Sequence, residues 1–158
     1  MKLEKNYIIL DCNSLQDPDI EWFDAQYLQF GCIGFVKTEM KSPEAEKYCM
    51  SRGYRLVEIY NQNQQDFIVE KCTNIGSIQG LEFQGFWIGL KRTIGTSTWK
   101  WLNSDVMPEF TAWDTSMGEP HNGDGDLLAI AYRGYGYKWV DFGLRNTNVN
   151  KPICQKLN

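Results

Sequence analysis

The 158-residue sequence predicts an α+β fold, and three observations carry that prediction. Two segments with the helical spacing of apolar residues come first, and short β-type runs fill the remainder of the chain. The residues are 42% hydrophobic and 14% aromatic, enough to bury a packed core at a one-domain length. Five widely spaced cysteines in such a domain are typical of disulfides formed in an oxidising compartment.

The first predicted helix begins at Ser42-Pro43, where a serine hydroxyl can cap the helix and proline suits its first turn. Ala45, Tyr48 and Cys49 then fall on one face, and Gly53 supplies the residue that helices favour just beyond their end. Strands are expected on both sides of this helix, over residues 34–36 and 56–59.

A second helix is expected to begin near Asn61 or Asn63, with Gln64 available as a capping partner. Its apolar stripe consists of Ile68, Cys72 and Ile75, which are spaced four and three residues apart. The pattern after this helix is β-type, with expected strands at residues 86–90, 98–101, 127–132, 138–142 and 152–156.

A stretch of about 25 residues between two of these strands, residues 102–126, has no periodicity and is rich in proline and glycine. A loop of this length in a compact domain is usually either functional or disordered. Because it carries Phe110 and Trp113, which need burial, we expect an ordered, functional loop.

The charge pattern argues against two classes of partner. The net charge is -4, and lysine and arginine do not cluster into a basic face, so no nucleic-acid partner is expected. The longest apolar runs, such as residues 7–10 and 127–131, are far shorter than the ~20 residues of a membrane-spanning helix, so no membrane insertion is expected. The first residues do not resemble a signal peptide, which leaves the cysteines as the indication of a secreted protein.

From Trp87-Ile88-Gly89-Leu90 onward, the sequence resembles the C-type lectin family. The later motifs follow in the order typical of that family: Trp99-Lys100-Trp101, Trp113, Glu119-Pro120-His121, residues 126–130, Trp139-Val140-Asp141 and Ile153-Cys154-Gln155. Upstream, the helix that carries Cys49 and the segment 55–59 also match. The resemblance covers residues 12 to 157. It implies one C-type lectin-like domain over residues 1–158, with two helices packed on antiparallel sheets and a long ligand-binding loop.

The resemblance also implies a disulfide pattern. Cys49 is expected to pair with Cys154, and Cys12 with Cys32, so that a hairpin within an N-terminal extension of residues 1–35 is stapled to the body. Cys72 is left over, either as a small buried hydrophobe or as an intermolecular bridge in a homo-oligomer. No cysteine lies in a Cys-x-x-Cys motif and only His121 could join the cysteines, so a structural zinc site is not expected.

One departure from the family concerns its usual second conserved disulfide. The matching positions are Leu127 and Leu144. Because both cysteines are absent together, we expect the two leucines to touch and to replace the bridge with a hydrophobic contact.

The resemblance further implies a calcium site in the long loop, where sugar-binding relatives hold one ion. Calcium prefers six to eight hard oxygen ligands, and the expected ligands here are Glu119, Asn122, Asp124, Asp126 and Asp141. Two usual ligands are missing, since His121 and Val140 stand where the family has asparagine. The same residues 119–125 also suit an ordinary polar turn, so calcium binding stays open from the sequence alone.

The expected sugar-binding residues overlap this set and add an aromatic side chain: they are Glu119, His121, Asn122, Asp124, Asp141 and Phe142. Phe142 is the candidate for stacking on a sugar ring. The four tryptophans at 87, 99, 101 and 139 are expected in the core. Tyr135 and Tyr137 flank Gly136 in a predicted turn, either as exposed contacts or as ordinary strand residues.

The resemblance therefore implies a secreted, extracellular carbohydrate-recognition module, calcium-dependent and active in innate-immune or cell-surface recognition, with a carbohydrate or glycoprotein ligand. The alternative is a calcium-independent, protein-binding domain of the same fold. An enzyme is not expected, because the single histidine, His121, has no nucleophile motif beside it and no phosphate-binding glycine loop follows a strand.

Overall fold

The computed structural model describes residues 9–123, 127–143 and 150–157, and it has the predicted α+β architecture. Its two α-helices are α1 (Ser42–Ser51) and α2 (Gln62–Gly76). The strands are β1 (Ile20–Asp24), β2 (Cys32–Val36), β3 (Arg55–Leu56), β4 (Gly85–Arg92), β5 (Trp99–Trp101), β6 (Leu127–Tyr132), β7 (Trp139–Gly143) and β8 (Lys151–Lys156). Within these described ranges, no helix has the length and apolar character needed to cross a membrane.

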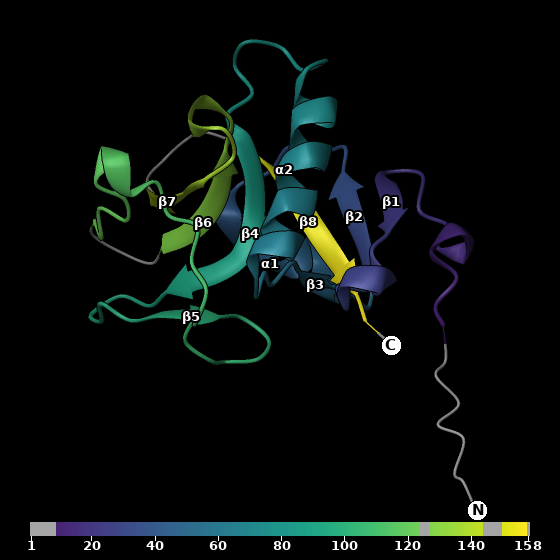
Figure 1. Ribbon diagram of the computed structural model, residues 1–158, viewed down its shortest axis with the longest axis horizontal. Coiled ribbons are helices and arrows are strands. Elements are labelled where there is room, and N and C mark those ends of the chain that lie inside the picture. The colour runs from purple at the N-terminus through teal and green to yellow at the C-terminus, as the bar shows by residue number, and fades with distance from the viewer. Residues whose placement is uncertain (1–8, 124–126, 144–149, 158) are drawn as a thin grey trace, which may run out of the picture.

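The strands form one mixed sheet in the order β1-β2-β8-β4-β6-β7, with β3 paired to β8 and β5 paired to β4. In Figure 1, β1 and β2 lie at one end of the molecule, β6 and β7 lie toward the other, and β8 and β4 lie between them. The expectation of purely antiparallel pairing is wrong at one place, because β4 and β8 run parallel, with Phe86 opposite Lys151 and Trp87 opposite Pro152. Parallel pairing needs a crossover connection, and the chain between the two strands supplies it.

The two helices cover opposite faces of this sheet. Successive side chains of a strand point to opposite faces, and along β4 the buried Phe86 and Ile88 join the hydrophobic cluster that contains α2. Trp87, between them, joins the cluster that contains α1. The four tryptophans expected in the core are buried, between 0% and 7% exposed.

Helix α1 begins differently from the prediction. Ser42 is its first helical residue and Lys41 occupies the cap position, so the Ser42 hydroxyl is not the cap. The Glu44 carboxylate accepts the backbone N–H of Lys41 at 3.4 Å, and the Ala45 N–H donates to the Lys41 carbonyl at 3.0 Å. The end of the helix agrees with the prediction: Gly53 has a φ of +80°, and Tyr54 N–H donates to the Cys49 carbonyl at 2.9 Å.

Helix α2 begins after Asn61, whose Oδ1 accepts the backbone N–H of Gln64 at 2.9 Å, which decides between the two predicted starts. Ile68 and Cys72 are fully buried against the sheet. Cys72 is a free cysteine, and burial raises the pKa of its thiol well above the usual value. Because the thiol is inaccessible, the structure favours the buried hydrophobe over an intermolecular bridge.

The long loop packs on the core instead of extending into solvent. Phe110 and Trp113 contact the ring of Trp139, each with a centroid separation of 5.9 Å. The backbone of Trp139 also donates to the Ala112 carbonyl at 2.8 Å. The predicted order is therefore observed over the described part of the loop, residues 102–123.

A buried carboxylate fixes the start of this loop. Glu58 is fully buried, and its Oε2 accepts the backbone N–H groups of Asn103 at 2.8 Å and Ser104 at 3.4 Å, while Tyr60 donates to Oε1. Burial alone would raise the pKa of Glu58, but these hydrogen bonds and the Arg55 charge outweigh it and lower the pKa below its ordinary value.

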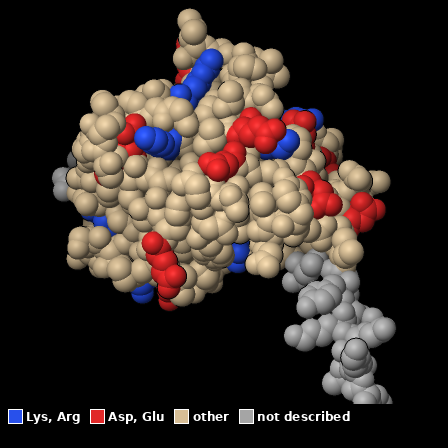
Figure 2. Space-filling model, in the orientation of Figure 1, with Lys and Arg blue, Asp and Glu red and all other residues tan. Residues whose placement is uncertain are grey.

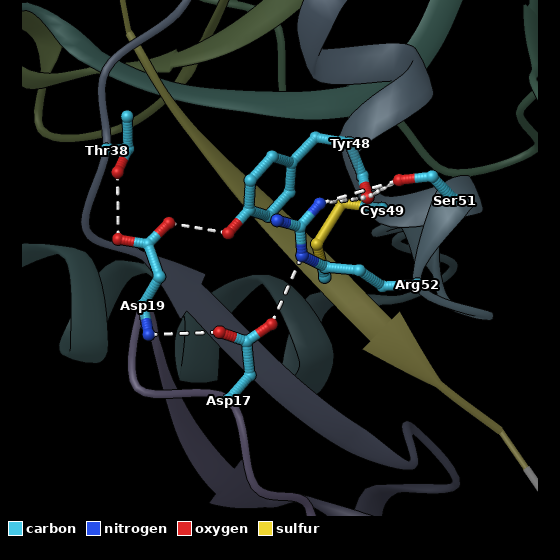
Figure 3. Close-up of polar contacts among 8 residues, drawn as sticks. Asp17, Asp19, Thr38, Tyr48, Cys49, Ser51 and Arg52 are labelled. Carbon is cyan, nitrogen blue, oxygen red and sulfur yellow. Dashed lines mark hydrogen bonds and ion pairs between the residues drawn. A yellow bond between two sulfur atoms is a disulfide. The ribbon is translucent and has the colours of Figure 1, made fainter.

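The N-terminal segment is attached by a hairpin and a polar cluster. Strand β1 pairs with β2, which in turn pairs with β8. Figure 3 shows side chains of α1 and its C-terminal end directed toward the segment before β1: Tyr48 donates to Asp19 at 2.5 Å, and Arg52 pairs with Asp17 at 3.1 Å. Burial, followed by the hydrogen bond to Asp19, raises the pKa of Tyr48.

The structure contains the disulfides Cys12–Cys32 and Cys49–Cys154, which are separated by 20 and 105 residues in the sequence. The expected contact between Leu127 and Leu144, in place of the family's usual second conserved disulfide, involves the Leu127 side chain and Leu144. Both lie outside the described part of the structure. Figure 2 shows acidic and basic side chains interspersed on one face of the molecule instead of segregated by sign.

The two disulfides should differ in what they contribute to stability. In the chain-entropy model a longer closed loop gives a larger effect, about 5 kcal/mol for Cys49–Cys154 and about 3 kcal/mol for Cys12–Cys32. We expect replacement of both Cys49 and Cys154 by alanine to lower the free energy of unfolding more than replacement of both Cys12 and Cys32 does. Urea unfolding of each double variant, with the other bridge intact, measures this difference. An equal or reversed order would show that loop closure is not what the long bridge supplies.

Replacing Glu58 with glutamine should cost about 1–3 kcal/mol at neutral pH, because an amide N–H₂ would face the donors that the carboxylate satisfies. The contribution of Glu58 is fully present above its unfolded pKa of about 4.3 and is lost as the pH falls through the lower folded pKa. Urea unfolding across this pH range should therefore show that the free energy of unfolding of the wild type approaches that of the Glu58→Gln variant as the pH falls. The exposed Glu82→Gln is the control, and a constant difference between wild type and Glu58→Gln at all pH values would contradict the assignment.

Candidate functional site

Two buried carboxylates from distant parts of the chain meet at the end of the long loop. Glu119 follows a short 3-10 turn (Thr115–Met117), and its backbone N–H donates to the Asp114 carbonyl at 3.1 Å. Asp141 lies on β7, and its backbone N–H donates to Glu119 Oε2 at 3.3 Å. The peptide bond between Glu119 and Pro120 is cis. Each of the two carboxylate side chains is only 6% exposed, so the site is built into the fold.

His121 lies over this pair. Its Nδ1 is 2.9 Å from Glu119 Oε1 and 3.9 Å from Asp141 Oδ1, while its side chain is 63% exposed. Candidate ligand atoms of the three residues all lie within 4.8 Å of one another. The arrangement brings one imidazole nitrogen and two carboxylates to a single point at the protein surface.

The electrostatics of the pair reflect burial and like charge. Burial raises the pKa of Glu119, and the neighbouring Asp141 raises it further. The Asp141 backbone N–H and the His121 charge act in the opposite direction but do not reverse the shift. Two anionic groups held this close favour a cation or a set of hydrogen-bond donors beside them.

Asn122 reaches the site through its backbone. Its N–H donates to Asp141 Oδ2 at 2.6 Å, whereas its side-chain oxygen accepts the indole N–H of Trp99 at 2.9 Å. Asn122 has a φ of +52°, a left-handed conformation that asparagine tolerates better than most residues. The next residue is held too, because the buried Arg92 donates to the Gly123 carbonyl. Sequence reasoning did not identify the roles of Arg92 and Trp99 here, since neither lies near the loop in sequence.

A pocket of about 210 Å³ opens beside the carboxylate pair. Besides Glu119 and Asp141, its lining consists of Gln84, Tyr132, Tyr135, Val140 and Phe142. Tyr132 and Tyr135 contact each other edge-on at 4.7 Å, and the half-buried Phe142 packs on Trp87 at 6.0 Å. Tyr135, left open by the sequence, therefore lines the pocket, whereas Tyr137 is buried and its pKa is raised to about 12, chiefly by burial.

The structure thus brings together four of the expected site residues, Glu119, His121, Asn122 and Asp141, with Phe142 next to them. Asp124 and Asp126 lie outside the described residues. Val140, which stands where the family has asparagine, is 3% exposed and belongs to the core under the pocket. Sequence reasoning missed Gln84 and Tyr132, because only the pairing of β4 with β6 places the ends of those strands beside this loop.

A second, larger cavity of about 430 Å³ lies along the β4–β5 hairpin. Its lining includes two lysines and three threonines: Lys91, Thr93, Thr96, Thr98, Lys100, Trp101, Leu102 and Asp105. Lys91 is paired with Glu46 at 2.9 Å. This cavity contains no convergent set of carboxylates, so the smaller pocket is the better candidate for a ligand site.

Comparisons with known proteins identify the family of this chain. The family model described as the lectin C-type domain matches residues 38–156. Ladderlectin of Oncorhynchus mykiss is 30% identical over 125 residues, which are 77% of this chain and 62% of ladderlectin. A perlucin-like protein of Mytilus galloprovincialis is 24% identical over 123 residues, 78% of this chain and 74% of that protein. The chain thus spans less than two thirds of the length of ladderlectin.

Solved structures share the fold. The carbohydrate-recognition domain of the human scavenger receptor C-type lectin gives a TM-score of 0.62 at 24% identity, covering 91% of this chain and all of that one. Ovocleidin-17 from the calcified eggshell layer of Gallus gallus gives 0.68 at 22% identity, covering 90% and 99%. The chain therefore belongs to the family of C-type lectin domains, which are binding proteins rather than enzymes.

Proposed function

We propose that this chain is a carbohydrate-recognition module that works outside the cell, and that glycan hydroxyls bind at the Glu119–Asp141 pair. The observation that carries the proposal is a buried carboxylate pair that opens into a pocket with aromatic walls. The two disulfides support an oxidising, extracellular setting, and recognition of glycans or glycoproteins there fits innate-immune or cell-surface roles.

The chemistry of the pocket suits a sugar ring. A pyranose presents hydroxyl donors along its edge, which carboxylate oxygens accept, and an apolar C–H face, which packs on aromatic rings. Phe142 and the edge-on pair of Tyr132 and Tyr135 supply such surfaces beside the carboxylates.

A divalent cation at the carboxylate pair would strengthen this recognition, and calcium is the ion that the family implies. Glu119 and Asp141 bring two carboxylates to one place, which fits part of the six to eight oxygens that calcium prefers. The remainder would come from water and sugar hydroxyls, so one calcium ion at most fits the described residues. When bound, the ion would neutralise the pair and polarise the hydroxyls that contact it.

The second candidate function is calcium-independent binding of a protein partner. The contact between His121 Nδ1 and Glu119 Oε1 at 2.9 Å favours it, because it supplies the carboxylate pair with a partner from the protein itself. Measuring binding with and without a chelator separates the two functions.

Replacing Glu119 with glutamine should reduce glycan affinity by about tenfold or more, since the charge-assisted hydrogen bonds to sugar hydroxyls are lost while the shape is kept. The measurement is binding to immobilised glycans, screened first on an array and then titrated with the best ligand. Glu109→Gln, an exposed change in the same loop, is the matched control and should leave binding unchanged. Unaltered affinity in Glu119→Gln would place the ligand elsewhere.

The aromatic wall gives an independent prediction. Phe142→Leu keeps an apolar side chain against Trp87 but removes the flat ring, so we expect glycan affinity to fall by about fivefold to tenfold with little change in melting temperature. The same titration provides the affinity, and a thermal melt verifies the fold. If affinity holds while the fold is intact, the sugar does not pack on this ring.

A further inference from the structure

We infer that Glu119, His121 and Asp141 form a site that prefers zinc, or a similar d-block divalent cation, over calcium. The inference concerns the site of the proposed function, and it rests on that function only for its biological use. Cation binding can be measured without any glycan, so the two can fail separately.

The donor set is the first argument. Imidazole nitrogen is a good ligand for zinc and its neighbours in the d-block, whereas calcium takes hard oxygens. His121 presents Nδ1 toward the two carboxylates, so one nitrogen and two carboxylate groups converge. One histidine combined with carboxylates is a ligand combination that suits zinc, for which three protein ligands leave the fourth position open.

The spacing is the second argument. Ligand atoms bound to one zinc ion at tetrahedral angles, with bonds of 2.0–2.1 Å, lie about 3.3 Å apart. The distances from His121 Nδ1 to Glu119 Oε1 and to Asp141 Oδ1 are 2.9 and 3.9 Å, on either side of that value. Shifts of about half an ångström, within the freedom of an exposed histidine side chain, would bring both of these distances to the tetrahedral value. The candidate ligand atoms of all three residues lie within 4.8 Å of one another.

The orientation of Asn122 is the third argument. An asparagine in this loop is the residue expected to add an amide oxygen for calcium, but the Asn122 oxygen accepts the indole N–H of Trp99 at 2.9 Å. Its backbone N–H holds Asp141 Oδ2 at 2.6 Å, which fixes the orientation of that carboxylate. The third group directed at the carboxylate pair is thus the imidazole of His121 and not an amide oxygen.

The proposed cation site adjoins the ligand pocket. The carboxylates of Glu119 and Asp141 line that pocket, and the His121 side chain, 2.9 Å from Glu119 Oε1, is 63% exposed. Water or a sugar hydroxyl can therefore occupy the fourth position on the ion, where a d-block cation would polarise it as a Lewis acid.

The test is calorimetric titration of the metal-free protein with zinc chloride and with calcium chloride, near neutral pH and without glycan. We expect zinc to bind with a Kd about a hundredfold lower than that of calcium. In His121→Asn, the zinc Kd should rise by about a hundredfold while calcium binds at least as well as before. The chain has one histidine, so its imidazole NMR resonances report the ligand directly and should shift on zinc addition.

Glu109→Gln is the control for nonspecific binding by carboxylates and should titrate as the wild type does. Calcium binding more tightly than zinc, zinc affinity unchanged in His121→Asn, or imidazole resonances unmoved by zinc would each overturn the inference. If the protein binds glycan in the presence of calcium or of a chelator but does not bind zinc, this inference is wrong and the proposed function is supported. If zinc binds at His121 but no glycan binds, this inference is supported and the proposed function is wrong.

Discussion

Strand β8 is the element on which the remainder of the structure depends. It pairs with β2 along one edge and with β3 and β4 along the other, so it joins the N-terminal hairpin to the strands that build the ligand site. Its side chains alternate between the two halves of the core, with Ile153 on the side of α2 and Cys154 on the side of α1. The disulfide from Cys154 to Cys49 fixes the end of the chain to its first helix across 105 residues.

The position of the site follows from this arrangement. Because β8 holds β4 in place, β6 and then β7 continue the sheet away from it, and Asp141 is placed by its register on β7. The loop that carries Glu119 is brought to the same place by contacts with Trp139, two residues before Asp141. The carboxylate pair is therefore held by a strand on one side and by a loop packed on that strand on the other. Burial of both groups in this way makes their arrangement pre-organised, which reduces the entropic cost of binding a ligand.

Much of the fold could be predicted from the sequence because its signals are local. The apolar stripe of α2 and the glycine that ends α1 follow from spacing and backbone preference, and the tryptophans of the core follow from their place in strand-like segments. The parallel pairing of β4 with β8 could not be predicted, since no local pattern distinguishes the direction of a strand's neighbour. The cap at Lys41 was missed because the competing acceptor, Glu44, acts on the residue before the serine.

For the site too, some features could be predicted from local sequence signals and others could not. Glu119, His121 and Asp141 could be identified from the order of motifs, but no local pattern indicates that the Trp99 indole donates to the side-chain oxygen of Asn122. That hydrogen bond spans 23 residues, and it makes the imidazole the third group facing the carboxylates. The aromatic wall of the pocket could not be predicted either. In the sequence Tyr132 is an ordinary residue at the end of a strand, and only the folded sheet and loop place it beside the carboxylates. Long-range contacts thus decide the chemistry of a site whose residues are recognisable individually.

The central claim is that a glycan binds at the carboxylate pair and its adjoining aromatic pocket. Amide chemical shifts of the ¹⁵N-labelled protein, recorded while the best glycan is titrated in, test it most directly. Saturating shifts are expected at His121, Asn122, Asp141 and Phe142, with little change along the β4–β5 hairpin. Shifts concentrated at Thr93, Thr96 and Thr98, around the larger cavity, would contradict it.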